Sequence, residues 1–144
     1  MKKEFTEGEV TTVAEEILKH ISLRAISGRA TLLALSGDLG AGKTTLSQAL
    51  ARMLGVTEHV ISPTFLIQKK YALEGQKWKS LIHIDAYRLD HSRELLTLGW
   101  EETLRDPDNL ILLEWPEKVV DILPESAYRV SLEHSENGTR TISF

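Results

Sequence analysis

Apolar side chains near the start of the chain recur at the spacing of one helical face. Thr6, followed three residues later by Glu9, has the pattern of a capping box, which satisfies free backbone N–H groups at a helix N-terminus. Residues three or four positions apart lie on the same side of an α-helix. The pattern predicts a helix that ends before Gly28 and buries Val10, Val13, Ala14, Ile17, Leu18 and Ile21.

Two short apolar runs show no alternation of polar and apolar positions. They are ATLLALS at residues 30–36 and NLILLEW at residues 109–115. Continuous apolar runs of this length are typical of strands that are buried on both faces of a parallel sheet. Between the two runs, a helical pattern covers residues 42–54, and Gly55 is placed to end that helix.

Two pairs of β-rich segments predict antiparallel hairpins. VISPTFLIQKKYAL (60–73) and WKSLIHIDAY (78–87) are separated by EGQK, while AYRVSLEH (127–134) and TRTISF (139–144) are separated by SENG. Pro63 lacks the N–H that a sheet requires, so residues 62–64 are expected on a loop. These elements predict an α/β fold: one domain over residues 1–144, with a mixed, mostly parallel sheet flanked by helices.

Shorter helices are expected in the second half of the chain. Asp90 is predicted to cap a short helix through residues 92–99, and WEETLR at 100–105 adds another turn. Pro116 fits the first turn of a further helix that ends before Pro124.

Composition narrows the class of protein. The chain has 144 residues, of which 42% are hydrophobic, which suits one domain with a real core. A net charge of -4 argues against a general surface for binding nucleic acid. QKKY at residues 68–71 is the candidate for a local basic patch, with a solvated strand edge as the favoured alternative.

The lack of cysteine excludes disulfides and thiol chemistry. We find no membrane span or signal peptide and expect a cytoplasmic protein.

Residues 37–44, GDLGAGKT, match the phosphate-loop pattern G-x-x-x-x-G-K-[ST] at every fixed position. Glycines allow backbone N–H groups to approach phosphate oxygens, and the helix that begins here directs its positive end at the same oxygens. A chance match is the alternative, but the strand before the loop and the helix after it argue against chance. We expect Lys43 to reach the β- and γ-phosphates as a catalytic group and Thr44 to take one Mg²⁺ position. The predicted nucleotide-binding residues are Gly37, Asp38, Leu39, Gly40, Ala41, Gly42, Lys43, Thr44 and Thr45.

A magnesium–nucleotide site also needs a carboxylate, usually at the end of a neighbouring buried strand. Asp85 follows the apolar LIHI and Glu114 follows LILL, so both are candidates. The alternatives are a turn or capping role for Asp85 and an ordinary strand-end charge for Glu114. These residues leave open which carboxylate binds the metal directly.

Three further side chains near the carboxylates have more than one interpretation. His83 lies two residues before Asp85, so it could support that carboxylate or serve as a hydrogen-bonded core histidine. Arg88 could offset charge on a leaving phosphate, although a surface salt bridge is favoured. Trp115 is expected to pack in the protein rather than to stack on a nucleotide.

Five stretches together resemble a known family. GDLGAGKTT, SPTF, HIDAYRL, ELLTLG and LLEWPEK occur in the order and at about the spacing of the bacterial tRNA threonylcarbamoyladenosine biosynthesis ATPase, the TsaE family. The resemblance implies a small P-loop protein that binds ATP with Mg²⁺ and hydrolyses it weakly when alone. It also implies two partners, a threonylcarbamoyl-transferase (TsaD-like) and its non-catalytic paralogue (TsaB-like). Together they make N6-threonylcarbamoyladenosine at position 37 of tRNAs, and ATP hydrolysis resets the assembly. Contact of this chain with tRNA would be indirect or weak.

The same resemblance assigns roles to individual residues. It implies that Thr44 and Glu114 are the Mg²⁺ ligands and that Asp85 is needed for hydrolysis. It adds a nucleotide-responsive loop and two residues near the base or ribose. These further nucleotide-binding residues are Ser62 and Thr64 on the loop, and Thr6 and Arg140 near the base or ribose.

Two other function classes use the same loop. A small-molecule or nucleoside kinase is the main alternative, although the chain is short for an acceptor pocket and an arginine-bearing lid. A GTPase-type switch is the second. It is disfavoured because no N-K-x-D stretch is present, the asparagines being Asn109 and Asn137.

Overall fold

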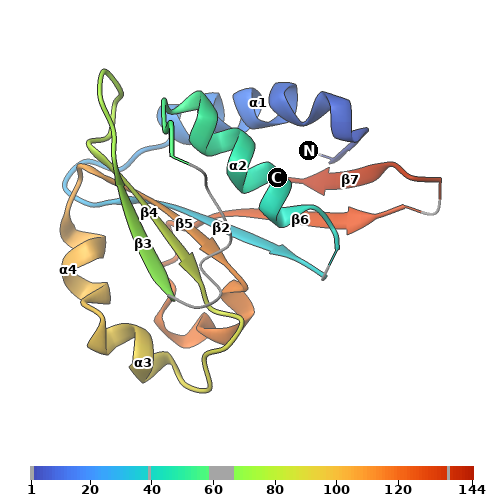
Figure 1. Ribbon diagram of the computed structural model, residues 1–144. Helices are drawn as coiled ribbons and strands as arrows, with labels where there is room; N and C mark the ends of the chain where they lie inside the picture. The colour runs from blue at the N-terminus through green and yellow to red at the C-terminus, as the bar shows by residue number, and fades with distance from the viewer. Residues whose placement is uncertain (1, 39, 59–66, 136) are drawn as a thin grey trace.

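A mixed β-sheet runs through the centre of the molecule, with helices on both faces (Figure 1). The computed structural model describes residues 2–38, 40–58, 67–135 and 137–144. The strands, in chain order, are β1 (Lys2–Phe5), β2 (Thr31–Gly37), β3 (Gln68–Ala72), β4 (Ser80–Asp85), β5 (Asn109–Glu114), β6 (Tyr128–His134) and β7 (Arg140–Ser143). The helices are α1 (Val10–Leu23), α2 (Lys43–Met53), α3 (Ser92–Thr97) and α4 (Trp100–Arg105), with short 3₁₀ helices η1 (Glu7–Glu9), η2 (Pro116–Lys118) and η3 (Val120–Ile122).

The order of strands across the sheet is β1-β7-β6-β2-β5-β4-β3. The four central strands β6, β2, β5 and β4 run parallel to one another, while the hairpin partners β3 and β7 run antiparallel to β4 and β6. The predicted α/β fold with a mixed, mostly parallel sheet is therefore confirmed, as are both hairpins. The carboxyl ends of β2, β4 and β5 meet at one edge of the sheet.

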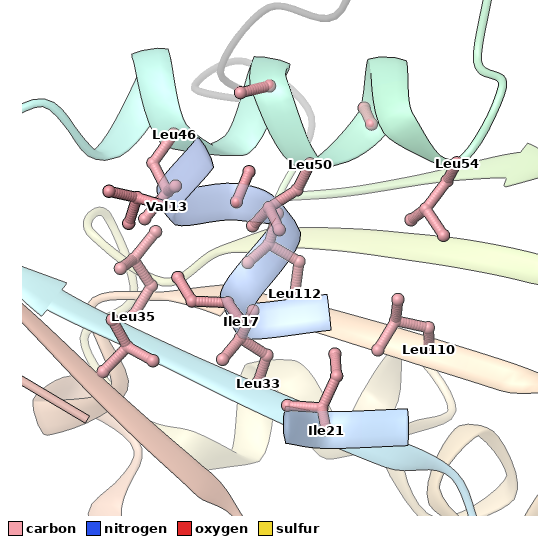
Figure 2. Close-up of a cluster of buried hydrophobic side chains, with 14 of the residues drawn as sticks. Val13, Ile17, Ile21, Leu33, Leu35, Leu46, Leu50, Leu54, Leu110 and Leu112 are labelled. Carbon is pink, nitrogen blue, oxygen red and sulfur yellow. The ribbon is translucent and has the colours of Figure 1, made fainter. Parts of the chain in front are cut away.

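Two hydrophobic layers cover the faces of this sheet. On one face, α1 and α2 pack over β2 and β5 (Figure 2). On the other face, Leu95 of α3 and Trp100 of α4 pack against strand residues such as Ile82 and Ile111. Alternate residues of β2 and β5 thus enter opposite layers, which explains why their sequences are apolar without alternation. The residues labelled in the first layer are Val13, Ile17, Ile21, Leu33, Leu35, Leu46, Leu50, Leu54, Leu110 and Leu112.

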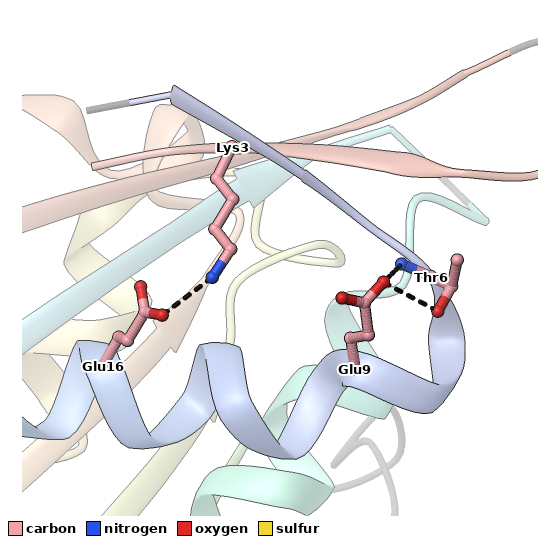
Figure 3. Close-up of polar contacts among 4 residues, drawn as sticks. All are labelled: Lys3, Thr6, Glu9 and Glu16. Atoms are coloured by element: carbon pink, nitrogen blue, oxygen red, sulfur yellow. Dashed lines mark hydrogen bonds and ion pairs between the residues drawn. The ribbon is translucent and has the colours of Figure 1, made fainter.

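The 3₁₀ helix η1, which leads into α1, begins with the predicted capping box. The backbone N and the Oγ1 of Thr6 both donate to Oε1 of Glu9, at 3.0 Å each (Figure 3). These two hydrogen bonds, the backbone bond first, lower the pKa of the Glu9 carboxyl. Lys3 of β1 pairs with Glu16 of α1 at 2.7 Å. The edge strand β1, which has four residues and pairs with β7, was not predicted from the sequence.

Two local predictions were wrong. The N-cap of α3 is His91, not Asp90, because Glu94 accepts hydrogen bonds from the backbone N atoms of both residues in a capping box. The helix expected after Pro116 is instead the pair η2 and η3, interrupted at Val119, whose φ of -134° is not helical. None of the helices in the described ranges is long and apolar enough to cross a bilayer.

Candidate functional site

A glycine-rich loop joins the end of β2 to the start of α2, and Gly42 is the N-cap residue of that helix. Gly42 has a φ of 101°, a backbone conformation that residues other than glycine rarely adopt. Gly37 has a second constraint, because a methyl group there would lie 2.7 Å from the backbone O of Leu132 in β6. The loop therefore requires glycine at both ends for different physical reasons.

Gly37→Ala is expected to destabilise the fold by about 1–3 kcal/mol, because the added methyl group meets backbone that cannot rotate away. Gly40→Ala is the matched control in the same loop. Its φ of 81° is also positive, but nothing lies within 4 Å of an added methyl group. Urea unfolding should give a larger loss for Gly37→Ala. Equal losses would show that contact with Leu132 does not constrain the loop.

Lys43, the first residue of α2, is buried, with 6% of its surface exposed. Its Nζ donates to the backbone O of Gly37 and, at 3.3 Å, to the backbone O of Asp38. The same Nζ lies 3.8 Å from the centre of the Trp115 ring, a cation–π contact. The lysine is thus held among the loop carbonyls and an aromatic face.

The electrostatic setting of Lys43 combines burial with negative charge. Burial lowers the pKa of its amino group below the usual lysine value, and nearby carboxylates oppose this shift. A buried cation beside exposed loop backbone is suited to an anionic ligand, since a ligand charge would replace the lost hydration. The opposing carboxylates, in decreasing order of effect, are Glu114, Glu117, Asp85 and Asp38.

The two candidate carboxylates lie side by side at the carboxyl edge of the sheet. Asp85 is the last residue of β4 and Glu114 the last of β5, and the register of these parallel strands pairs them directly. Both are buried, with 7% and 2% of their surface exposed. Oδ1 of Asp85 accepts a hydrogen bond from the backbone N of Tyr87 at 3.0 Å. Asp85 therefore stabilises the turn after β4 as well as lining the site.

His83 contacts a different carboxylate from the one proposed in the sequence analysis. Its Nε2 lies 2.5 Å from Oε2 of Glu114, and both side chains are buried. Support for Asp85 and a hydrogen-bonded core histidine were the two interpretations, and the buried contact to Glu114 on the neighbouring strand agrees with the second. The reason is the register: His83 pairs with Leu112, which places Glu114 on the diagonal.

Trp115 follows β5 in a left-handed conformation, with a φ of 60°. It is the non-glycine residue with positive φ in the described ranges, and such strain is often found at functional sites. Its ring packs against Tyr87, with 5.0 Å between ring centres, and against the amino group of Lys43. Trp115 therefore packs against both Tyr87 and the loop lysine, and that it does not stack on a nucleotide stays a prediction.

These residues surround one cavity of about 400 Å³. Arg140, the first residue of β7, also lines it, and a methyl group at Gly42 would lie 2.8 Å from Arg140 Nη1. That Nη1 is buried and has no hydrogen-bond partner among the described residues. The residues that line the cavity are Asp38, Gly40, Gly42, Lys43, Thr44, Thr45, Asp85, Tyr87, Glu114, Trp115 and Arg140.

The structure thus brings together most of the predicted site residues. Tyr87 is the lining residue that the sequence analysis did not single out, although it lies within the HIDAYRL stretch. Ala41 belongs to the loop, but its side chain is buried in the hydrophobic core, and Gly37 does not line the cavity. Thr6 also lies outside the lining, with its hydroxyl bonded to Glu9. Leu39, Ser62 and Thr64 lie outside the described residues. Nucleotide contacts by these residues stay predictions.

The oxygen donors in the cavity fit Mg²⁺. Mg²⁺ usually takes one or two protein carboxylates and completes its coordination with water and substrate phosphates. Asp85, Glu114 and Thr44 line one cavity and supply such oxygens. Within the described ranges, no group of three or more His, Cys, Asp or Glu side chains could hold a metal alone. The donor set therefore suits a cation that arrives with a phosphate ligand.

A phosphate loop between a buried strand and a helix, opening where parallel strands end, defines the P-loop class of nucleotide-binding proteins. A model of the family "Threonylcarbamoyl adenosine biosynthesis protein TsaE" matches residues 6–142. The chain belongs to the TsaE family.

Individual relatives agree with this assignment. The tRNA threonylcarbamoyladenosine biosynthesis protein TsaE of Haemophilus influenzae is 35% identical over 81% of this chain and 72% of its own length. The protein of the same name from Streptomyces coelicolor is 39% identical over 75% and 72%, respectively. The crystal structure of Bacillus subtilis YdiB matches 99% of this chain and 82% of that chain, with a TM-score of 0.72 and 26% identity.

Proposed function

We propose that this chain is a magnesium-dependent ATP-binding protein and weak ATPase that serves threonylcarbamoyladenosine formation on tRNA. The observation that carries the proposal is the position of Lys43, buried in the phosphate loop beside the two carboxylates at the ends of β4 and β5. Membership of the TsaE family supplies the connection to the tRNA modification.

Each loop group has a distinct part in this proposal. Backbone N–H groups at the start of α2 would bind phosphate oxygens, and Lys43 would turn from the loop carbonyls toward the β- and γ-phosphates. Glu114 and Thr44 would hold Mg²⁺, and the bound ion would neutralise part of the phosphate charge. Asp85, fixed by the Tyr87 backbone, would orient the attacking water.

Arg140 is proposed as a further nucleotide contact. Its buried Nη1 lacks a hydrogen-bond partner among the described residues and lies over Gly42 at the loop. Buried donors are nearly always satisfied in native proteins, so an unsatisfied one beside a phosphate loop suggests an anionic or hydroxyl-bearing ligand. This observation supports the contact to the nucleotide that the family resemblance implies.

We further propose that the chain acts in the cytoplasm with a TsaD-like transferase and a TsaB-like paralogue. The net charge of -4 argues against tight contact of this chain with tRNA. Any direct tRNA binding would then be weak and strongly salt-dependent. In this arrangement, ATP hydrolysis resets the assembly between rounds.

Reconstituted tRNA modification tests this proposal. With a TsaD-like and a TsaB-like protein, a threonylcarbamoyl donor and unmodified tRNA, product formation should continue beyond one round only when this chain and ATP are present. Modification at the same rate without the chain would contradict the proposal. Transfer of phosphate from ATP to a small acceptor, rather than to water, would instead identify the kinase alternative.

A further inference from the structure

His83 is a buried polar residue that the phosphate-loop mechanism does not use. We propose that it is a positioning residue for Glu114: its Nε2 holds one oxygen of the carboxylate so that the other faces Mg²⁺. The inference rests on the proposed function, because it takes Glu114 as a metal ligand.

The geometry that supports this role is set by two parallel strands. Residues 81, 83 and 85 of β4 face the same side of the sheet as residues 110, 112 and 114 of β5. Nε2 of His83 meets Oε2 of Glu114 at 2.5 Å, with 1% and 2% of the two residues exposed. The bond occupies one oxygen, and the Glu114 side chain also lines the nucleotide cavity. The second oxygen, Oε1, is therefore the one we assign to the metal.

The surroundings of His83 do not require a histidine for packing. Three residues border it on the same face: Leu81 two residues before it, Leu112 of β5 and Lys69 of β3, of which the two leucines belong to the hydrophobic core. Nδ1 of His83 is buried and has no hydrogen-bond partner among the described residues. An apolar residue would avoid that unsatisfied atom. The contact with Glu114 is thus the feature that distinguishes histidine from leucine at this position.

Such a contact has a known physical consequence for a metal ligand. A carboxylate with both oxygens free can rotate and can bind a cation through either one. A partner that fixes one oxygen orients the other before the metal arrives, and loss of such partners typically lowers metal affinity by about 10–100-fold. The effect should appear in metal binding and not in nucleotide binding measured without metal.

Two amide variants of His83 test whether the hydrogen-bonding nitrogen must lie at the position of Nε2. The amide nitrogen of glutamine can take the place of Nε2, whereas that of asparagine lies nearer the place of Nδ1, which does not touch Glu114. His83→Gln should therefore keep the function and His83→Asn should lose it. Leu81→Ala, on the same strand and face, is the control for lost packing, because Leu81 is equally buried.

The experiment measures Mn²⁺ binding in the presence of ADP, with free Mn²⁺ followed by its electron paramagnetic resonance signal. ADP affinity without metal is measured in parallel. We expect Mn²⁺ affinity to fall by about tenfold or more in His83→Asn. It should stay near the parent value in His83→Gln and Leu81→Ala, and metal-free ADP affinity should not change.

Different outcomes overturn different claims. Parent-like Mn²⁺ affinity in His83→Asn, or an equal loss in Leu81→Ala, would overturn the positioning role and leave the proposed function intact. Parent-like Mn²⁺ affinity in Glu114→Gln would overturn the metal role of Glu114 itself, and the inference about His83 with it.

Discussion

Lys43→Met should nearly abolish nucleotide binding while leaving the fold at least as stable as that of the parent. The removed charge is the buried cation of the phosphate loop, and the loss of one partner from a buried charge-assisted contact costs about 2–5 kcal/mol. The expected loss in ATP affinity is therefore roughly 30-fold or more. Isothermal titration calorimetry measures it directly.

The stability of the same variant follows from the pKa of Lys43. Burial lowers that pKa, so the folded protein disfavours the charged amino group. The resulting destabilisation is fully present below the folded-state pKa and disappears as the pH rises through it toward the usual lysine value. Methionine removes this cost, so thermal unfolding at neutral pH should show no loss of stability, and the difference from the parent should shrink at alkaline pH.

Two results would contradict this account of Lys43. Unchanged ATP affinity in a folded Lys43→Met protein would remove the lysine from the site. Equal weakening in Lys70→Met, which neutralises an exposed lysine on β3, would indicate a general charge effect.

Glu114→Gln should remove the Mg²⁺ dependence of nucleotide binding. Glutamine keeps the size of the side chain and its contact with His83 but removes the negative charge that a hard cation needs. We expect the gain in ADP affinity on adding Mg²⁺ to fall by about tenfold or more. Affinity without metal should hold or rise, because a negative charge beside the phosphates is gone.

Asp85→Asn is the comparison that assigns the ligand. Asp85 pairs with Glu114 across the two strands and lines the same cavity, but its Oδ1 also accepts the Tyr87 backbone hydrogen bond. If the Mg²⁺ response persists in Glu114→Gln and is lost in Asp85→Asn, the direct ligand is Asp85. The assignment of Glu114 would then be wrong.

The elements that are specified by a pattern of a few adjacent residues could be predicted from the sequence. The apolar runs of β2 and β5, the capping box at Thr6 and the glycine spacing of the loop are all local patterns. Each reflects a physical requirement of a few adjacent residues, such as burial on both faces or a close approach of backbone to phosphate. The fold class and the loop followed from these patterns.

The contacts that depend on register could not be predicted in the same way. His83 and Glu114 are separated by 31 residues in sequence, and only the alignment of β4 with β5 brings them together. The position of Lys43 against the Trp115 ring likewise depends on the left-handed turn after β5, for which no local glycine gives a signal. His91 replaced Asp90 as the cap of α3 because the side chain of Glu94 reaches back to it.

We propose that the phosphate loop hydrolyses ATP in the service of a partner complex. The most direct test is steady-state ATP hydrolysis by this chain, alone and with the TsaD-like and TsaB-like proteins, with Lys43→Ala as the control. We expect a low rate for the chain alone, stimulation that requires both partners, and no activity in the variant. A rate that both partners leave unchanged, or one that survives in Lys43→Ala, would contradict the account.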